Sequence, residues 1–229
     1  MCSRFNLVVE QSRLERYLGF EFGFELVTSP NIAPTEPVLG VVTEGGVRAA
    51  RIFRWGLEPS WAVAPGRGPL INVRSETAPE RFRSTFAKRR CLIPATGFFE
   101  WQTLPQASGK PIKQPYNFHL PDGGPFTMAG LWERRKLADG GFSESCSVIT
   151  CEPNEVVSPF HDRMPAILDR DDWDLWLSGE EAPATLQPLL RPYPAADLIA
   201  TQVSRALSNP RLKDPTTLQP EAQGRLDMD

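Results

Sequence analysis

Long hydrophobic runs are missing from this sequence. None of its 229 residues lies in an apolar stretch that approaches the ~18 residues of a membrane-spanning helix. The first six residues, MCSRFN, also lack the apolar core of a secretory signal. We therefore expect a cytoplasmic protein.

Cysteine and histidine are also scarce. The histidines are His119 and His161, and the cysteines, which show no Cys-x-x-Cys spacing, are Cys2, Cys91, Cys146 and Cys151. Because structural zinc needs clustered ligands of these types, the sequence predicts no metal site. Free thiols in a reducing compartment fit this pattern better than a disulfide scaffold.

The chain carries little net charge, but its charge is unevenly distributed. The formal net charge of −3 predicts no general attraction to a polyanion. Residues 1–110 nevertheless contain 14 Lys and Arg and 10 acidic residues, and the segment from Arg74 to Arg90 contains six basic residues and only two acidic ones. This run indicates either a local anion-binding patch or a solvated helix face, and charge alone does not decide between them.

Proline is abundant at 23 residues, about twice the usual ~5%, which favours many short elements. Apolar, β-branched or aromatic segments bounded by Gly or Pro predict strands over residues 38–43, 47–55, 91–101, 116–120, 126–132 and 145–150. Capping-box patterns at residues 12–15 and 77–80 predict two helices, the first through residue 18, and a third is expected over 171–177. Because strands follow one another without helices between them, the fold class is α+β, with a largely antiparallel sheet or barrel in one domain. The polar residues from Ser208 onward predict a loose tail.

Cys2 is the most unusual candidate for chemistry. Removal of Met1 would leave an α-amine and a thiol on one residue, and the α-amine has a reference pKa of ~7.7 to 8.0, so that it is partly unprotonated at neutral pH. Such an amine forms an imine with an aldehyde, and the neighbouring thiol can then close a thiazolidine ring. The alternative is that Cys2 is a small buried hydrophobic residue.

Glu100 and His161 are the other candidates. Glu100 ends an apolar segment between Phe99 and Trp101, so desolvation by these aromatic residues could raise its pKa for acid–base work. An ordinary charge at a strand edge is equally consistent with that pattern. His161 lies in an expected loop and could move protons near neutral pH, although most loop histidines have no such role.

Six motifs occur in a characteristic order along the chain. They are Met1-Cys2-x-Arg4-Phe5, Trp55-Gly56-Leu57-x-Pro59-x-Trp61, Asn72-x-Arg74-x-Glu76-Thr77, residues 90–101 (RCLIPATGFFEW), Ala129-Gly130-Leu131-Trp132-Glu133 and His161-x-Arg163-Met164-Pro165. Together they resemble the SRAP (SOS response-associated peptidase) family over residues 1 to about 168, and weakly to 207. Ser3, Val73 and Thr96 depart from the residues common in the family, but none of them is a proposed catalytic group.

The resemblance implies one SRAP domain over residues 1–207, with a β-barrel-like core, short peripheral helices and no cofactor. It implies an abasic-site sensor that binds single-stranded DNA and shields the lesion in the DNA damage response. Cys2 would form a thiazolidine DNA–protein crosslink by lyase-like imine chemistry. Asn72 would orient the amino terminus and the sugar, Glu100 would handle protons at the amine, and His161 would help to open the sugar ring.

The same resemblance implies a set of DNA contacts. Arg4, Arg74, Arg83 and Arg163 are the phosphate candidates, Trp61 and Pro34 would wedge against neighbouring bases, and Thr150 would line the pocket. We expect a monomer that associates with the nucleoid when it is bound to DNA.

Two other functions stay open. One is a cysteine peptidase or hydrolase with Cys2 as nucleophile and His161 as base, any peptidase activity being limited to the removal of Met1. The other is a module that binds single-stranded DNA without a covalent bond.

Overall fold

Thirteen strands dominate the part of the chain that the structure describes. The computed structural model describes residues 2–59, 68–106, 109–179 and 181–219. In chain order, the strands are β1 (Phe5–Leu7), β2 (Ser29–Ile32), β3 (Pro37–Glu44), β4 (Val47–Trp55), β5 (Asn72–Arg74), β6 (Arg90–Ala95), β7 (Gly97–Leu104), β8 (Ile112–His119), β9 (Phe126–Lys136), β10 (Phe142–Cys151), β11 (Met164–Pro165), β12 (Ile167–Leu168) and β13 (Ile199–Gln202). The α-helices are α1 (Gln11–Leu18), α2 (Ala78–Arg81), α3 (Arg83–Lys88), α4 (Trp173–Leu177) and α5 (Pro183–Leu186). Five 3₁₀ turns complete the described elements: η1 (Arg170–Asp172), η2 (Gln187–Leu189), η3 (Ala195–Asp197), η4 (Arg205–Ser208) and η5 (Pro215–Leu218).

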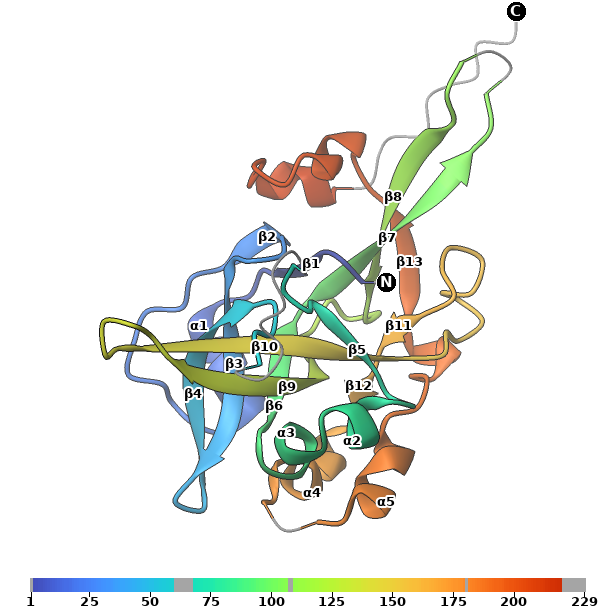
Figure 1. Ribbon diagram of the computed structural model, residues 1–229. Helices are drawn as coiled ribbons and strands as arrows, with labels where there is room; N and C mark the ends of the chain where they lie inside the picture. Colours follow the sequence, from blue (N-terminus) through green and yellow to red (C-terminus); the bar gives the residue numbers. More distant parts are fainter. Residues whose placement is uncertain (1, 60–67, 107–108, 180, 220–229) are drawn as a thin grey trace, which may run out of the picture.

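Five strands close a barrel at the centre of the molecule. Going round it, β4 pairs with β3, β3 with β6, β6 with β9, β9 with β10, and β10 returns to β4 (Figure 1). All of these pairs are antiparallel except β10 with β4, and β5 adds a second parallel pairing along β10. The barrel contains fully buried apolar side chains, including Phe53, Leu92 and Val148. The expected α+β class with a mainly antiparallel, barrel-like core is confirmed.

A second, fully antiparallel sheet stands beside the barrel, in the order β13-β8-β7-β1-β2. The prediction of one continuous strand over residues 91–101 is wrong. The chain passes from the barrel to the second sheet at Thr96, between β6 and β7. The Thr96 hydroxyl donates to Asn6 Oδ1 at 2.6 Å and accepts from the Val8 backbone N–H at 2.9 Å. A Cβ on Gly97 would lie 2.2 Å from Asn117 Oδ1, so only glycine fits there.

Helix starts differ from the capping pattern. The box expected at residues 12–15 is wrong: the N-cap residue of α1 is Glu10, two positions before Ser12, and the Glu15 carboxylate accepts from Gln11 Nε2 and the Phe22 N–H instead. The second helix does start where expected, with Thr77 as the N-cap residue of α2, but the Thr77 side chain makes no capping hydrogen bond and the helix breaks at Phe82 into α2 and α3.

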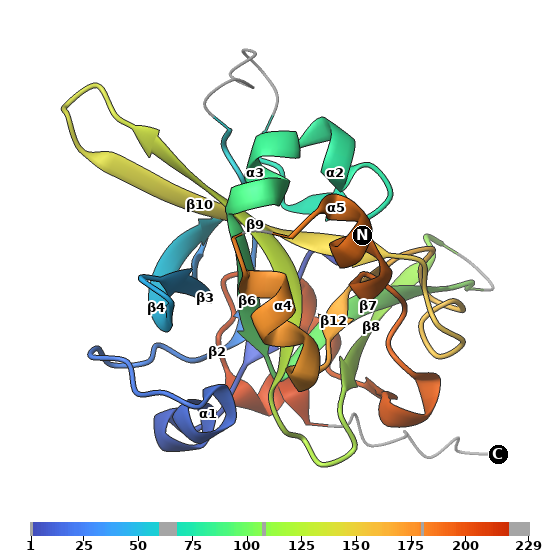
Figure 2. The ribbon, with the colours of Figure 1, turned by 90° about the horizontal axis from the view of Figure 1, so that it is seen from below.

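The helix expected over residues 171–177 is present as α4, with its first turn in the 3₁₀ form of η1. It covers the barrel beside β6, where Trp176 Nε1 donates to the Cys91 carbonyl at 3.0 Å (Figure 2). Among the helices in the described ranges, none combines the length and the apolar composition needed to cross a membrane.

The segment from Ser208 is not loose as far as residue 219. Buried Asn31 Nδ2 lies 3.0 to 3.1 Å from three carbonyl oxygens, those of Leu207, Asn209 and Leu212, and its two hydrogens are shared among them. The Arg4 guanidinium donates to the Leu207 and Ser208 carbonyls, and Lys213 pairs with Glu36 at 2.7 Å. The polar composition of this segment predicted a free tail. Its partners could not be inferred from the sequence, because they lie almost 200 residues away. We call Arg4, Asn31, Lys213 and the carbonyls of residues 207–212 the C-terminal anchor.

Substitution of Asn31 tests the anchor. Asn31→Ala leaves the Asn209 and Leu212 carbonyl groups without their donor and removes the Oδ1 acceptor of Arg4, so we expect the free energy of unfolding to fall by about 2 kcal/mol in urea denaturation. The control Asn209→Ala removes an exposed carboxamide from the same segment and should cost less than about 0.5 kcal/mol. Equal effects of the two substitutions would contradict the anchor.

Candidate active site

Cys2 lies at the entry to β1 and is completely buried. Strand β1 pairs with the start of β7, Phe5 with Phe98 and Asn6 with Gly97, which brings Cys2 next to the strand that carries Glu100. The Cys2 thiol donates to the Arg4 carbonyl oxygen at 3.5 Å. Burial, reinforced by the negative charge of Glu100, holds the pKa of this thiol well above its usual range, so the thiol stays protonated at neutral pH.

Asn72 fixes Cys2 from the opposite side. It begins β5, whose parallel pairing places Asn72 beside Val148 of β10. Its Nδ2 donates to the Cys2 carbonyl oxygen at 2.7 Å. Its Oδ1 is buried and accepts no hydrogen bond from any described residue, which leaves one acceptor available next to Cys2.

Glu100 is a buried acid on β7, with 4% of its surface exposed. Burial raises the pKa of Glu100 to about 7, the positive charge at the amino terminus opposes this, and Asp162 adds to it. A carboxyl group with this pKa can both donate and accept a proton near neutral pH. The flanking aromatic residues are not the cause that we expected, because alternation along β7 turns Phe99 away, into a separate cluster with Val203 and Leu207.

His161 follows β10 and is partly buried, which lowers its pKa. Its Nδ1 accepts from the Arg163 backbone N–H at 3.0 Å and also lies 2.8 Å from Asp162 Oδ1. These contacts make opposite demands on Nδ1, since a carboxylate needs a proton there. We assign the neutral ring with its proton on Nε2, because the backbone N–H can only donate and the lowered pKa favours the uncharged form.

The arginines expected to contact phosphate fall into two groups. Arg4 is held in the C-terminal anchor and lies over the ring of Trp101. Arg163 is buried and makes a bidentate pair with Glu76 at 2.7 and 2.9 Å. Arg74 and Arg83 are instead exposed, and neither is in an ion pair with another described residue.

The remaining predicted contacts lie around these residues. Thr150 is fully buried, and its carbonyl oxygen accepts a hydrogen bond from Arg163 at 2.5 Å, so Thr150 helps to hold the Arg163 side chain in place. Pro34 is half-buried in the turn between β2 and β3, next to Thr35 with its φ of 76°. Trp61 lies outside the described residues.

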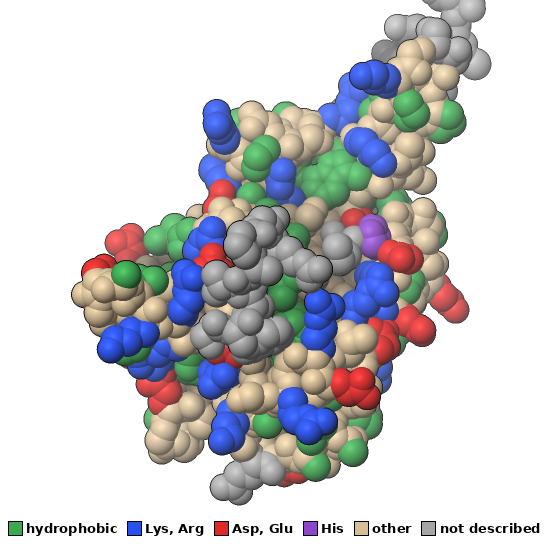
Figure 3. Space-filling model, in the orientation of Figure 1, with side chains coloured by type: hydrophobic (Ala, Val, Ile, Leu, Met, Phe, Trp, Pro, Cys, Tyr) green, Lys and Arg blue, Asp and Glu red, His purple; other side chains and the backbone are tan. Residues whose placement is uncertain are grey.

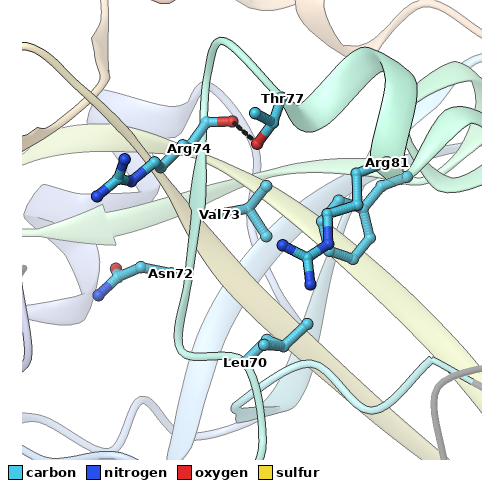
Figure 4. A pocket seen from close by; sticks show the side chains of 7 residues that line it. Leu70, Asn72, Val73, Arg74, Thr77 and Arg81 are labelled. Atoms are coloured by element: carbon cyan, nitrogen blue, oxygen red, sulfur yellow. Dashed lines mark hydrogen bonds between the residues drawn. The ribbon is translucent and has the colours of Figure 1, made fainter.

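A pocket of about 160 Å³ opens beside Asn72 (Figure 4). It is lined by Leu70, Asn72, Val73, Arg74, Thr77, Arg81 and Phe82. Sequence reasoning missed Arg81 as a site residue, although Arg81 belongs to the basic run between Arg74 and Arg90. Figure 3 shows Lys and Arg side chains spread over this face of the molecule, with Asp and Glu side chains at both its left-hand and right-hand edges. In the part of the chain that the structure describes, no cluster of three His, Cys, Asp or Glu residues could hold a metal ion.

The order of the motifs and the barrel beside an antiparallel sheet together define one protein family. The chain belongs to the family described as SOS response associated peptidase (SRAP), which matches residues 1–210. The expected family resemblance is confirmed.

Several relatives and solved structures are similar to the chain. The abasic site processing protein YoqW of Bacillus subtilis (strain 168) is 34% identical, over 96% of this chain and 99% of the relative. The abasic site processing protein HMCES of Xenopus tropicalis is 32% identical, over 73% of this chain and 56% of the longer relative. A crystal structure from Bacteroides thetaiotaomicron superposes with a TM-score of 0.83 over 96% of this chain and all of that one; at 24% identity it supports the fold alone. A structure from Bordetella bronchiseptica has a TM-score of 0.73 at 27% identity, over 89% of this chain and all of that one.

The raised pKa of Glu100 has a consequence for stability. Because the folded pKa of about 7 exceeds the unfolded value of about 4.5, the ionised form destabilises the fold, fully above pH 7 and hardly at all below pH 4.5. Glu100→Gln should therefore raise the free energy of unfolding by about 3 kcal/mol at pH 8 and by less than about 1 kcal/mol at pH 5. Urea denaturation at both pH values measures this.

The control for that experiment is Glu80→Gln, which alters an exposed carboxylate and should change stability by less than about 0.5 kcal/mol at either pH. A gain from Glu100→Gln that is the same at pH 5 and pH 8 would show that Glu100 is not a buried acid with a raised pKa.

Proposed function

We propose that this protein senses abasic sites in single-stranded DNA and binds them covalently through Cys2, which shields the lesion during the DNA damage response. One arrangement carries the proposal: Cys2 is held by Asn72 beside an acid with a pKa of about 7. The relatives named abasic site processing proteins support the choice of DNA lesion. We propose further that the protein acts as a monomer in the cytoplasm and on the nucleoid.

The first chemical step uses the α-amine that removal of Met1 would free on Cys2. Its nitrogen attacks the aldehyde carbon of the ring-opened sugar, and loss of one water gives an imine. Both protons of the amine end on the departing oxygen as water, and Glu100 takes each from the nitrogen and passes it to the oxygen, which a group with a pKa of about 7 can do in both directions. The acceptor Oδ1 of Asn72 lies beside Cys2 to orient the amine or a sugar hydroxyl.

The second step closes the ring. The Cys2 sulfur adds to the imine carbon, and the thiol proton ends on the nitrogen, so the thiazolidine forms with no further loss of atoms. Because the raised pKa keeps the thiol protonated, the amine reacts first and the sulfur second. Both nucleophiles sit on one residue, which makes the closure intramolecular. His161, as a neutral ring, would move the proton that opens the sugar.

The exposed arginines are better placed than the buried ones to bind the phosphates of single-stranded DNA. Arg74 and Arg83 have guanidinium groups available for phosphates, whereas Arg4 and Arg163 already make several hydrogen bonds within the protein. Pro34 stands in a turn from which it could contact a base, and Trp61 keeps the same proposed role.

A cysteine peptidase is less consistent with this site. Such an enzyme needs a thiolate, and burial together with Glu100 disfavours the ionised form of Cys2. Any peptide hydrolysis would then be confined to the removal of Met1. Repeated turnover of peptides by the purified protein would favour the peptidase instead.

Substitution of Cys2 tests the proposal directly. The purified protein with Met1 removed should form a heat-stable adduct with an abasic oligonucleotide, visible as one added mass with loss of one water. Cys2→Ser should give an adduct only after borohydride reduction, because a hydroxyl is a much weaker nucleophile than a thiol. Cys91→Ala, changed at another buried thiol, should keep the full adduct. A stable unreduced adduct from Cys2→Ser would sink the thiazolidine step.

Salt dependence separates the two groups of arginines. In a Cys2→Ala background, and on single-stranded DNA without an abasic site so that neither an imine nor a thiazolidine forms, Arg74→Ala should make the slope of log affinity against log salt shallower by about 0.7. Arg4→Ala should leave that slope unchanged and lower the stability of the protein instead, since its partners are carbonyl groups. A slope change from Arg4→Ala as large as that from Arg74→Ala would mean that Arg4 contacts phosphate.

A further inference from the structure

The pocket beside Asn72 is distinct from the groups that react. It shares only Asn72 with them, and that residue spans both places because its Nδ2 contacts the Cys2 carbonyl while its side chain lines the pocket. In Figure 4 the Arg74 and Asn72 side chains project from β5 on one side, and the Arg81 guanidinium points inward from α2. A nucleotide next to the lesion would therefore lie within reach of this pocket.

The pocket walls are apolar and its rim is polar. Leu70, Val73 and Phe82 supply the apolar surface, and the Arg81 guanidinium lies 6.0 Å from the centre of the Phe82 ring. Within the described ranges, neither Arg74 nor Arg81 is in an ion pair with a carboxylate. A nucleobase has this complementary form, with an apolar face for stacking and acceptor atoms at its edge.

The size of the pocket limits the base that fits. Its volume of about 160 Å³ is close to the ~150 Å³ of a protein cavity that accommodates one benzene ring. We propose that it binds the single ring of a pyrimidine next to the abasic site, an inference that rests on the proposed function. A purine adds a second fused ring, which the pocket does not enclose.

Hydrogen bonding in the pocket does not distinguish cytosine from thymine. Arginine carries donors only, and cytosine and thymine both present the O2 acceptor at the edge of the ring. The Arg81 guanidinium therefore pairs with either base, while Arg74, at the outer side of β5, neutralises the adjoining phosphate. The pocket selects ring size rather than one base.

The test uses oligonucleotides that contain one abasic site and differ only in one neighbouring base. Two series place T, C, A or G on the 5′ side or on the 3′ side of the lesion, and the rate of adduct formation is measured for each below saturation. On one side, T and C should react about tenfold faster than A and G, the factor that stacking of one base typically contributes.

Two exposed positions connect such a preference to this pocket. Arg81→Ala removes the edge contact and Thr77→Phe places a ring in the pocket, so each should bring the four rates to within about twofold while adduct formation continues. As the control, Arg13→Ala removes an exposed arginine on α1, which does not line the pocket, and it should keep the full preference.

Equal rates with all four neighbouring bases, or a preference that persists in both pocket variants, would contradict the proposal that the pocket binds a pyrimidine. Either result would leave the proposed function intact. Failure of every oligonucleotide to form an adduct would overturn the proposed function and the pocket with it.

Discussion

The hydrogen bond from Asn72 to the carbonyl oxygen of Cys2 is the contact on which the site depends. It joins two parts of the molecule that share no strand pairing, since Cys2 precedes β1 in the antiparallel sheet while Asn72 begins β5, which extends from the barrel strand β10. Each partner is fixed by its own sheet, so the contact positions Cys2 without a flexible element. Cys2 is held by the start of β1 on one side and by the Asn72 side chain on the other.

A cost in stability accompanies this geometry. Glu100 is buried where its charge is poorly solvated, and the same burial keeps the Cys2 thiol protonated. The two groups reinforce each other, because a negative charge on one disfavours ionisation of the other. Proteins commonly keep such unfavourable groups where chemistry requires them, and the rest of the apolar core compensates.

Local sequence pattern predicted some features well and others poorly. The strand of residues 47–55 and the barrel-like class followed from apolar, β-branched segments, and the family match was visible from six short motifs. The change of sheet at Thr96 was not predictable, because it depends on hydrogen bonds to Asn6 and on the space that Gly97 leaves for Asn117. The placement of Arg4 and Arg163 could not be predicted for the same reason. The positive charge of an arginine says only that it binds oxygen acceptors, and the tertiary fold decides whether that acceptor is a carbonyl group, a carboxylate or water.

The C-terminal anchor gives the synthesis of this protein a particular timing. Arg4 and its carbonyl partner at Leu207 are 203 positions apart, so Arg4 is among the first residues to leave the ribosome and its partner is among the last. At about 5 to 20 residues per second, the interval is on the order of 10 to 40 s. During that time the Arg4 guanidinium lacks the two carbonyl groups that hold it in the finished protein, so this contact forms only after nearly the whole chain has been made.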